Sequence, residues 1–275
     1  MIGFYSSFRA MGASNNRLSQ LGERLLASQA RLSRGSRLAK LGTDSSGLSI
    51  STKMKGLIDS FQVASRNVSD GISLAETAEG GLEQVADNLI RMRELAVRAS
   101  NGTLSSSDRT SIHNEFNELR EEVDRISDST EFNGVDLLDG STSSVSLQSG
   151  AYSGNTTDVD LVDTSSAALS IDDLDLTTSS DASSAISAID DAIDEVSVAR
   201  ASFGSSVNTL RSGLSTLQSS RISLSETHSR ISDLDYAAET AELTKLSLLH
   251  SAAVSTRLHA SLSSNRVNTL LIGHI

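Results

Sequence analysis

Carboxylate clusters and histidines are the side chains in this sequence that could do chemistry. Neither aspartate cluster has the loop of spaced oxygen ligands around a central glycine that calcium sites use, and no two histidines have a zinc-ligand spacing. The aspartates are better interpreted as solvated acidic faces, so we expect no metal site and no cofactor. The residues concerned are Asp172, Asp173 and Asp175, then Asp190, Asp191 and Asp194, and the histidines at 113, 228, 250, 259 and 274.

Signatures of nucleophilic and phosphate chemistry are also absent from the sequence. The many serines include no G-x-S-x-G elbow. Gly80-Gly81 lies inside a helical repeat rather than in a phosphate-binding loop with a lysine. No cysteine is present, which excludes disulfides and thiolate metal sites. We expect that the protein is not an enzyme.

Composition indicates long helices rather than a compact globule. The 275 residues are 3% aromatic and 37% hydrophobic, which is a low apolar content for a large compact core. They include no proline to interrupt a helix. No run of about 18 apolar residues is present, so we expect no membrane insertion. The first forty residues lack the continuous apolar segment of a cleavable signal peptide.

Charge is distributed unevenly along the sequence. The net charge is -12, yet residues 1–40 carry seven basic side chains and one acidic one, and residues 236–275 carry three basic and two acidic ones. The acidic middle makes nucleic acid an unsuitable partner. An Arg-rich and Ser-rich start also describes an organelle transit peptide. A seven-residue repeat favours a packed helix instead, and it comprises Phe4, Met11, Leu18, Leu25 and Leu32.

Residues 66–99 carry the strongest helical pattern. Their apolar residues recur at alternating steps of three and four, which places one narrow stripe along a helix and requires a partner helix nearly parallel to it. We expect this stripe to face inward, while Arg91, Arg93 and Glu94 face a neighbour or solvent. The stripe consists of Ala75, Ala78, Leu82, Val85, Leu89, Met92, Ala96 and Ala99.

Several signals set the expected ends of the helices. A first helix runs to about residue 34, and a second begins after a cap at Thr43 or Asp44, with a soft point at Gly71. A left-handed stop at Asn101-Gly102 ends the striped helix. We expect Ser107 or Asp108 to cap the next helix, whose seam is Ile112, Phe116, Leu119, Val123 and Ile126.

Residues 141–180 change character, and a long helix follows them. Short alternating pieces such as Val145-Ser-Leu147 and Val159-Asp-Leu161 predict strands or loops, with a disordered acidic linker as the alternative. Residues 181–231 then have an apolar residue at every seventh position. The last forty residues form another amphipathic segment. Since neither end of the protein has a local partner, we expect the two to pair with each other and with other copies of the protein.

Five blocks of this sequence closely resemble bacterial flagellin, in the same order and over about four fifths of the length. They are GLSIS at 47–51, RNVSDGISLAETAEGGL at 66–82, RMRELAVRASNGT at 91–103, EFNGVDLL at 131–138 and SRISDLDYAAETAELTK at 229–245. The resemblance implies a structural subunit that self-assembles into the extracellular filament used for motility. It also implies a mainly α fold, an elongated coiled-coil or helical-bundle rod with a short β-hairpin region.

The resemblance further implies a division into three parts. Residues 1–41 and 236–275 would form an inner coiled-coil tube in which the terminal helices pair. Residues 42–132 and 181–235 would form a helical rod, and residues 133–180 a short hairpin segment without bulky outer domains. The tube contacts between subunits would come from the repeat at residues 4–32 and from Leu246, Leu249, Leu258, Leu262 and Leu270.

The resemblance also implies partners. Besides the homopolymer these are an export chaperone, a filament cap and hook-filament junction proteins, with export through the flagellar type III apparatus. An innate immune receptor recognises some flagellins through positions that match Arg91, Leu95 and Glu115. Both ends of this sequence depart from the usual flagellin termini. Because both departures lie in the inner tube, they affect the contacts that would line it. The alternative functions are a hook-filament junction protein and a secreted rod-like adhesin or immune ligand.

Overall fold

A computed structural model describes the backbone of residues 2–38 and 44–272, and the side chains of residues 12, 14–38 and 44–262. The protein divides into two compact units. The first, here the central unit, comprises residues 57–222, and the second, here the terminal unit, comprises residues 1–56 and 223–275.

The described residues form a mainly α-helical protein with two small antiparallel sheets, which confirms the expected fold class. The elements in order are α1 (Ile2–Arg34), α2 (Ser45–Ala99), α3 (Ser106–Ser129), β1 (Glu131–Phe132), β2 (Val135–Asp136), β3 (Ser144–Gln148), β4 (Thr156–Asp160), α4 (Ser179–Ser232) and α5 (Tyr236–Ile272).

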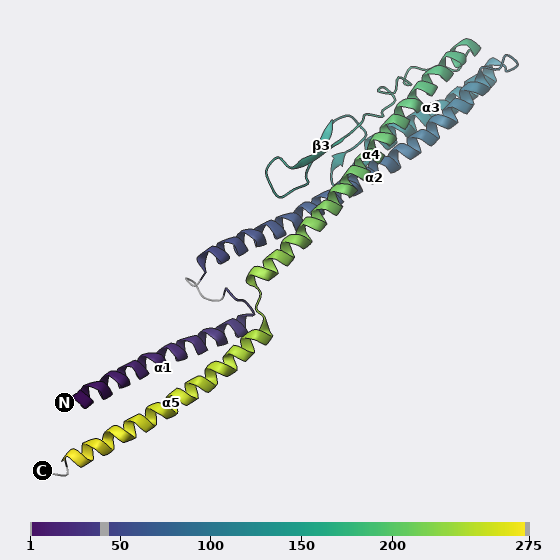
Figure 1. Ribbon diagram of the computed structural model, residues 1–275. Coiled ribbons are helices and arrows are strands. Elements are labelled where there is room, and N and C mark those ends of the chain that lie inside the picture. Colours follow the sequence, from purple (N-terminus) through teal and green to yellow (C-terminus); the bar gives the residue numbers. More distant parts are fainter. Residues whose placement is uncertain (1, 39–43, 273–275) are drawn as a thin grey trace. The chain divides into compact units, whose positions relative to one another are not determined.

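Three helices of the central unit lie side by side, as Figure 1 shows for α2, α3 and α4. Arg93 of α2 pairs with Asp190 of α4 at 2.5 Å, and further back along α2 Glu79 pairs with Arg200 at 2.8 Å. The later residue of α2 thus pairs with the earlier residue of α4, and the earlier residue of α2 with the later one. The two helices are therefore antiparallel.

The striped helix forms the centre of the core, as its spacing predicts. All eight stripe residues from Ala75 to Ala99 are fully buried. They belong to one cluster with the seam of α3 and with the seven-residue repeat of α4, which includes Ile189, Val196 and Phe203. Every buried member of this cluster lies between residues 64 and 217, so the apolar core belongs to the central unit.

The soft point expected at Gly71 is wrong, because α2 runs unbroken from Ser45 to Ala99. Gly71 is buried, and a Cβ added there would collide with Cδ1 of Leu147 on β3. The glycine therefore permits close approach of the β3–β4 hairpin to α2. A helix interior tolerates such a glycine at a cost of about 1 kcal/mol relative to alanine.

The corner between α2 and α3 is built differently from the expectation. Asn101 and Gly102 follow the end of α2, but neither has a positive φ, so the left-handed stop is wrong. Arg109 of α3 instead donates from Nε to the Ala99 carbonyl at 2.9 Å and from Nη2 to the Asn101 carbonyl at 2.8 Å. The guanidinium thereby satisfies carbonyls that a helix end leaves without partners.

The cap of α3 also lies two or three residues before the expected positions, Ser107 and Asp108. Ser105 is the N-cap, and its side chain accepts from the Asp108 amide while the Asp108 side chain accepts from the Ser105 amide. This reciprocal pair is a capping box, with Asp108 at its third helical position. Asp44 caps α2, as one of the two expected residues, through a 2.7 Å bond from the Gly47 amide.

Strands in residues 141–180 are confirmed. β3 and β4 pair antiparallel, with Val145 opposite Val159 and Leu147 opposite Thr157. Val159 is fully buried, which explains why this segment lies on the helices rather than forming a disordered linker. β1 and β2 form a separate hairpin of two-residue strands around Asn133-Gly134, the expected turn dipeptide.

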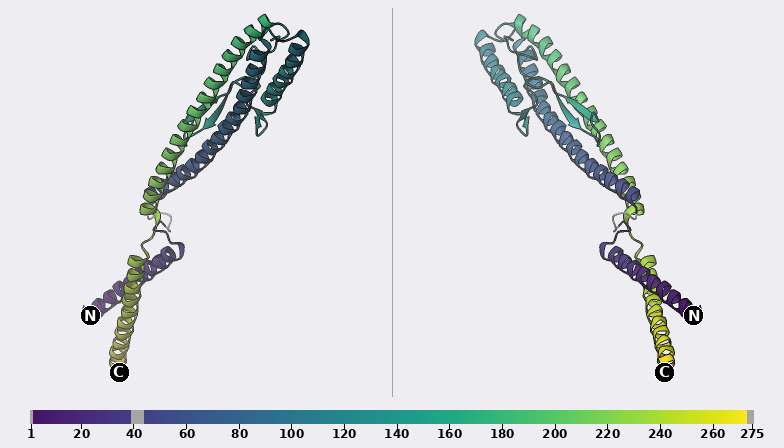
Figure 2. Two further views of the ribbon diagram at one scale, coloured as in Figure 1. Left: turned by 90° about the vertical axis from the view of Figure 1, so that its right-hand side faces the viewer. Right: turned by 90° about the vertical axis from the view of Figure 1, so that its left-hand side faces the viewer.

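The terminal unit is built on the pairing of α1 with α5. The two helices lie side by side and run in opposite directions (Figure 1, Figure 2), so the expected pairing of the two ends is confirmed. Near the start of α5 the segments that precede it and follow α1 are tied together by an isolated bridge between Ser36 and Asp233. Asp235 caps α5 by accepting from the amides of Ala237 and Ala238.

Candidate assembly interface

Helix α5 exposes a set of large apolar side chains. Its apolar residues are spread around the helix rather than gathered on one face, so the expected amphipathic segment is wrong, and the contact with α1 cannot cover every leucine. Leu246 is 3% exposed, whereas Leu248 is 66% exposed. Val254, Leu258 and Leu262 follow one another at four-residue steps and form a row along the helix. These three are 41%, 61% and 54% exposed, and Leu249 is 46% exposed.

The described leucines of the seven-residue repeat on α1 are only partly covered. Leu18, Leu25 and Leu32 are half-buried, which means that one partner helix does not enclose them. The side chains of Phe4, Met11 and Leu270 fall outside those that the structure describes. Of the ten residues expected at the subunit interface, the described ones thus range from buried Leu246 to strongly exposed Leu258.

An ion pair fixes α1 against the first turn of α5. Arg31 donates to one carboxylate oxygen of Glu239 from Nη2 at 2.6 Å and from Nε at 3.1 Å. These hydrogen bonds hold the pKa of the Glu239 carboxyl below its ordinary value, against the opposing effect of burial. The charge of Glu239 also suits the positive end of the α5 dipole.

A second exposed surface lies on α2 and α3 of the central unit. Arg91 bonds Glu94 at 2.7 Å and Glu115 at 2.8 Å, and its side chain remains 50% exposed. The hydrogen bond to Glu115 raises the pKa of the Arg91 guanidinium. Leu95 is only 1% exposed and packs in the core, so of the three expected receptor positions it offers almost no surface.

Several of the side chains that first suggested chemistry are engaged in structural contacts, and His274 lies outside the described residues. His113 of α3 accepts at Nδ1 from the Leu176 amide, and His228 of α4 lies 3.0 Å from the Ser51 hydroxyl. Asp190 is paired with Arg93, which lowers the pKa of the aspartate. Among the described residues, no group of three or more His, Asp or Glu side chains could hold a metal ion.

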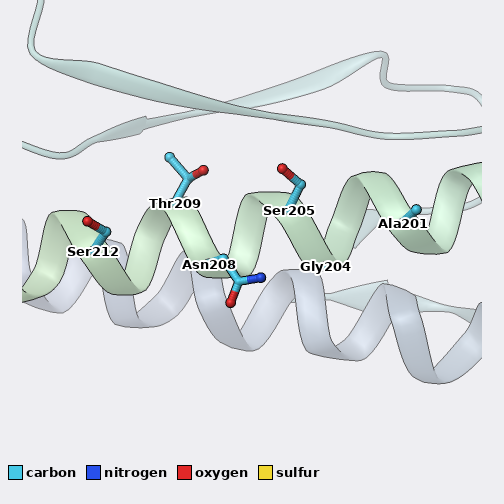
Figure 3. A pocket seen from close by; sticks show the side chains of 6 residues that line it. All are labelled: Ala201, Gly204, Ser205, Asn208, Thr209 and Ser212. Carbon is cyan, nitrogen blue, oxygen red and sulfur yellow. The ribbon is translucent and has the colours of Figure 1, made fainter.

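A shallow groove on α4 carries no ionisable side chain. Figure 3 shows the side chains of Ser205, Thr209 and Ser212 along one side of the helix, while the Asn208 side chain points away from that side. Ala201 and Gly204 complete the lining. The groove offers small polar side chains but no acid, base or thiol. None of the described helices has the length and apolar character needed to cross a lipid bilayer.

Comparison with known proteins places these features in one family. The bacterial flagellin N-terminal helical region matches residues 9–143, and the bacterial flagellin C-terminal helical region matches residues 186–270. The protein belongs to the bacterial flagellin family. This confirms the resemblance seen in the five sequence blocks, and the span between the two matched regions leaves no room for a large outer domain.

Individual flagellins are similar over nearly the whole length. A flagellin of Halalkalibacterium halodurans is 40% identical over 243 residues, covering 88% of this protein and 89% of its own length. A flagellin of Bacillus subtilis is 35% identical over 296 residues, covering 94% and 97%. The crystal structure of Bacillus cereus flagellin matches with a TM-score of 0.51 and 32% identity, covering 55% of this protein and 88% of that one.

This flagellin is therefore a structural subunit of the bacterial flagellar filament, a helical polymer used for motility. Its family is a family of structural proteins. Sequence reasoning named Leu249, Leu258 and Leu262 of α5 but missed Leu248 and Val254. The signal that could have found them is the lack of a polar face on α5, where apolar residues occur on every side of the helix.

Proposed function

We propose that this flagellin polymerises through its terminal unit, with the exposed apolar side chains of α5 buried against neighbouring subunits. The observation that carries the proposal is the row of Val254, Leu258 and Leu262, which a paired helix leaves in water. A monomeric soluble protein rarely exposes large contiguous apolar patches unless they are interaction sites.

The energy available from the exposed residues of α5 is adequate for assembly. Fully burying a Leu or Val side chain contributes about 1.5 to 3 kcal/mol, and five of them are about half exposed in the monomer, so their burial contributes on the order of 5 kcal/mol per subunit. By contrast, the terminal unit has no share in the buried apolar cluster of the central unit. We infer that neighbouring subunits complete a core that a single subunit cannot form.

In this proposal each part of the protein has its own place in the filament. Residues 1–41 and 236–275 form the inner tube, residues 42–132 and 181–235 the surrounding helical rod, and residues 133–180 a short hairpin segment on the rod. The antiparallel α1–α5 pair supports the first assignment, and the continuous core of α2, α3 and α4 supports the second. The protein acts by assembly and not by catalysis.

The proposal includes secretion and helper proteins. We infer that the protein is exported through the flagellar type III apparatus, and that it functions outside the cell. A chaperone would cover α5 before export, and a cap and hook-filament junction proteins would guide growth. The exposed leucines of α5 support a chaperone, since they would otherwise associate prematurely. The absence of proline and cysteine suits rapid refolding, because isomerisation and disulfide exchange are slow.

Seeded growth tests the assembly proposal. Purified protein is added to short filament fragments, and elongation is followed by electron microscopy. Leu258→Ser should prevent elongation because it removes an apolar contact, while Leu258→Met, which keeps an apolar side chain of similar volume, should elongate normally. Normal elongation by Leu258→Ser and its double variant with Leu262→Ser would overturn the proposal. Failure of the wild-type protein to extend fragments would favour the adhesin alternative.

A second function is receptor recognition at the exposed surface of α2 and α3. Arg91 and Glu115 lie side by side and remain accessible in one subunit, so a receptor of complementary charge could contact both. Leu95 would act indirectly, by holding α2 in the core. Binding of an innate immune receptor ectodomain should weaken on Arg91→Ala and stay unchanged on Arg125→Ala, whose side chain is similarly exposed on α3. Equal binding by both variants would contradict this role.

A further inference from the structure

The turn after α2 holds an asparagine amide in an unusual setting. Asn101, Gly102 and Thr103 are all exposed. The amide oxygen of the Asn101 side chain, Oδ1, accepts from the Thr103 amide at 3.1 Å and from the Thr103 hydroxyl at 3.0 Å. We propose that Asn101 is a site of spontaneous deamidation, with the Gly102 backbone nitrogen as the nucleophile and solvent water as the second reactant.

The reaction is chemically complete with these groups. The Gly102 nitrogen loses its proton and forms a bond to Cγ of Asn101, and the bond between Cγ and Nδ2 breaks as ammonia leaves with that proton. The product is a five-membered succinimide. Water then adds to one of its two carbonyl carbons and opens the ring, which yields aspartate or isoaspartate at position 101.

The nucleophile is accessible. Glycine has no Cβ to hinder approach of its nitrogen, and the space where a Cβ would stand at Gly102 contains no atom within 4 Å. Among the residues that the structure describes, the Gly102 amide has no hydrogen-bond partner that would have to be broken first. Attack by the Gly102 nitrogen therefore breaks no hydrogen bond made by that nitrogen.

The electrophile is activated. Attack on Cγ places negative charge on Oδ1, the atom to which Thr103 donates two hydrogen bonds. Donors aimed at an oxygen where charge develops lower the barrier for attack on a carbonyl. The Arg109 guanidinium, which binds the Asn101 carbonyl at 2.8 Å, adds positive charge nearby and would also neutralise the aspartate formed.

The other exposed Asn-Gly dipeptide provides an internal comparison. Asn133 has φ 52° and Gly134 φ 78°, and they form the two-residue turn between paired Phe132 and Val135. Ring closure requires rotation of the asparagine backbone, which strand pairing restrains at Asn133 and which hydrogen bonds to Arg98, Leu104 and Arg109 restrain at Asn101, so the two sites differ mainly at the side-chain oxygen. No donor to Asn133 Oδ1 exists among the described residues. The geometry therefore favours reaction at Asn101 over reaction at Asn133.

Deamidation would alter the corner between α2 and α3. A new carboxylate would stand at the negative end of the α2 dipole, which disfavours anions. Isoaspartate would in addition lengthen the backbone by one carbon and displace the carbonyl that Arg109 holds. The modification would thus loosen a contact that ends the longest core helix.

Peptide mapping by mass spectrometry tests the proposal on the full-length protein. The protein is incubated at mildly alkaline pH, and conversion of amide to acid is followed at Asn101 and Asn133 in the same molecules. We expect Asn101 to convert faster. Thr103→Val keeps the amide donor and removes the hydroxyl, and it should slow conversion at Asn101 by about fivefold, the factor that one ordinary hydrogen bond represents. Conversion at Asn133 should not change.

A second variant tests the role of the Gly102 nitrogen without disturbing the fold. Gly102→Ala should suppress conversion at Asn101 without unfolding the protein, because the added methyl group enters open space and the φ angle is not positive. Circular dichroism verifies that each variant is folded. Conversion at Asn133 as fast as at Asn101, or unchanged or faster conversion at Asn101 in Thr103→Val, would overturn the proposal.

Discussion

Arg31 of α1 donates two hydrogen bonds to a single carboxylate oxygen of Glu239 in the first turn of α5. The Glu239 side chain is only 13% exposed. The pair thus joins positions that are 208 residues apart in sequence, at the place where the terminal helices begin to pack. It gives the terminal unit a charged contact in addition to its small buried apolar surface.

This pair predicts loss of terminal packing in acid. Arg31 lowers the folded-state pKa of Glu239, so the stabilisation is present above the ordinary glutamate pKa of about 4.3 and is lost as the pH falls through the lower folded value. Filaments should therefore dissociate at lower temperature as the pH falls below about 4. Light scattering during heating at a series of pH values measures this.

Two variants separate Glu239 from other carboxylates. Glu239→Gln should lower the dissociation temperature at neutral pH and reduce its dependence on acid. Glu242→Gln is the matched control, because its partner Lys245 lies on the same helix and the pair is exposed. Equal behaviour of the two variants would show that the contact between Arg31 and Glu239 contributes nothing to the filament.

Neighbouring residues on α2 should differ sharply in their effect on the central unit. Leu89 is fully buried and Ile90 is 49% exposed. Leu89→Ala should lower the free energy of unfolding by about 2 to 5 kcal/mol, because it leaves a cavity, while Ile90→Ala should change it by about 0.5 kcal/mol or less. Urea unfolding of the monomer measures both. Similar losses for the two would contradict the inward direction of the stripe.

The adjacent glycines Gly80 and Gly81 should respond to alanine in opposite directions. A Cβ at Gly80 meets no atom within 4 Å, so Gly80→Ala should stabilise α2 by up to about 1 kcal/mol through helix propensity. A Cβ at Gly81 would stand 2.8 Å from the Thr130 hydroxyl and 2.9 Å from Cδ1 of Leu138. Gly81→Ala should therefore destabilise the protein, and a stabilising effect in thermal unfolding would contradict this packing.

These contacts also explain how far the sequence could predict the fold. Helix periodicity identified the stripe of α2 and the seams of α3 and α4, because burial of one face leaves a repeat that is visible in the sequence. The sequence wrongly suggested a soft point at Gly71. A glycine is needed there because Leu147, a residue distant in sequence, packs against the helix at that position. The sequence likewise suggested a left-handed stop at Asn101, where Arg109 of the next helix performs the capping.

The interface was harder to predict than the core. The heptad on α1 and the leucines of α5 indicated helices without local partners, and the structure shows which of them one partner leaves uncovered. Leu95 was expected only as a receptor position, because the three-and-four spacing of the stripe does not include it, yet it lies in the buried cluster beside the stripe. Only the packing of α2 shows that the side chain is buried.

Thiol labelling is the most direct test of the central claim, that exposed apolar side chains of α5 become buried on assembly. The protein has no cysteine, so Leu258→Cys introduces a single reporter. We predict fast labelling in the monomer, strong protection in the filament, and fast labelling again after the filaments are dissociated by heat. Equally fast labelling in monomer and filament would contradict the claim.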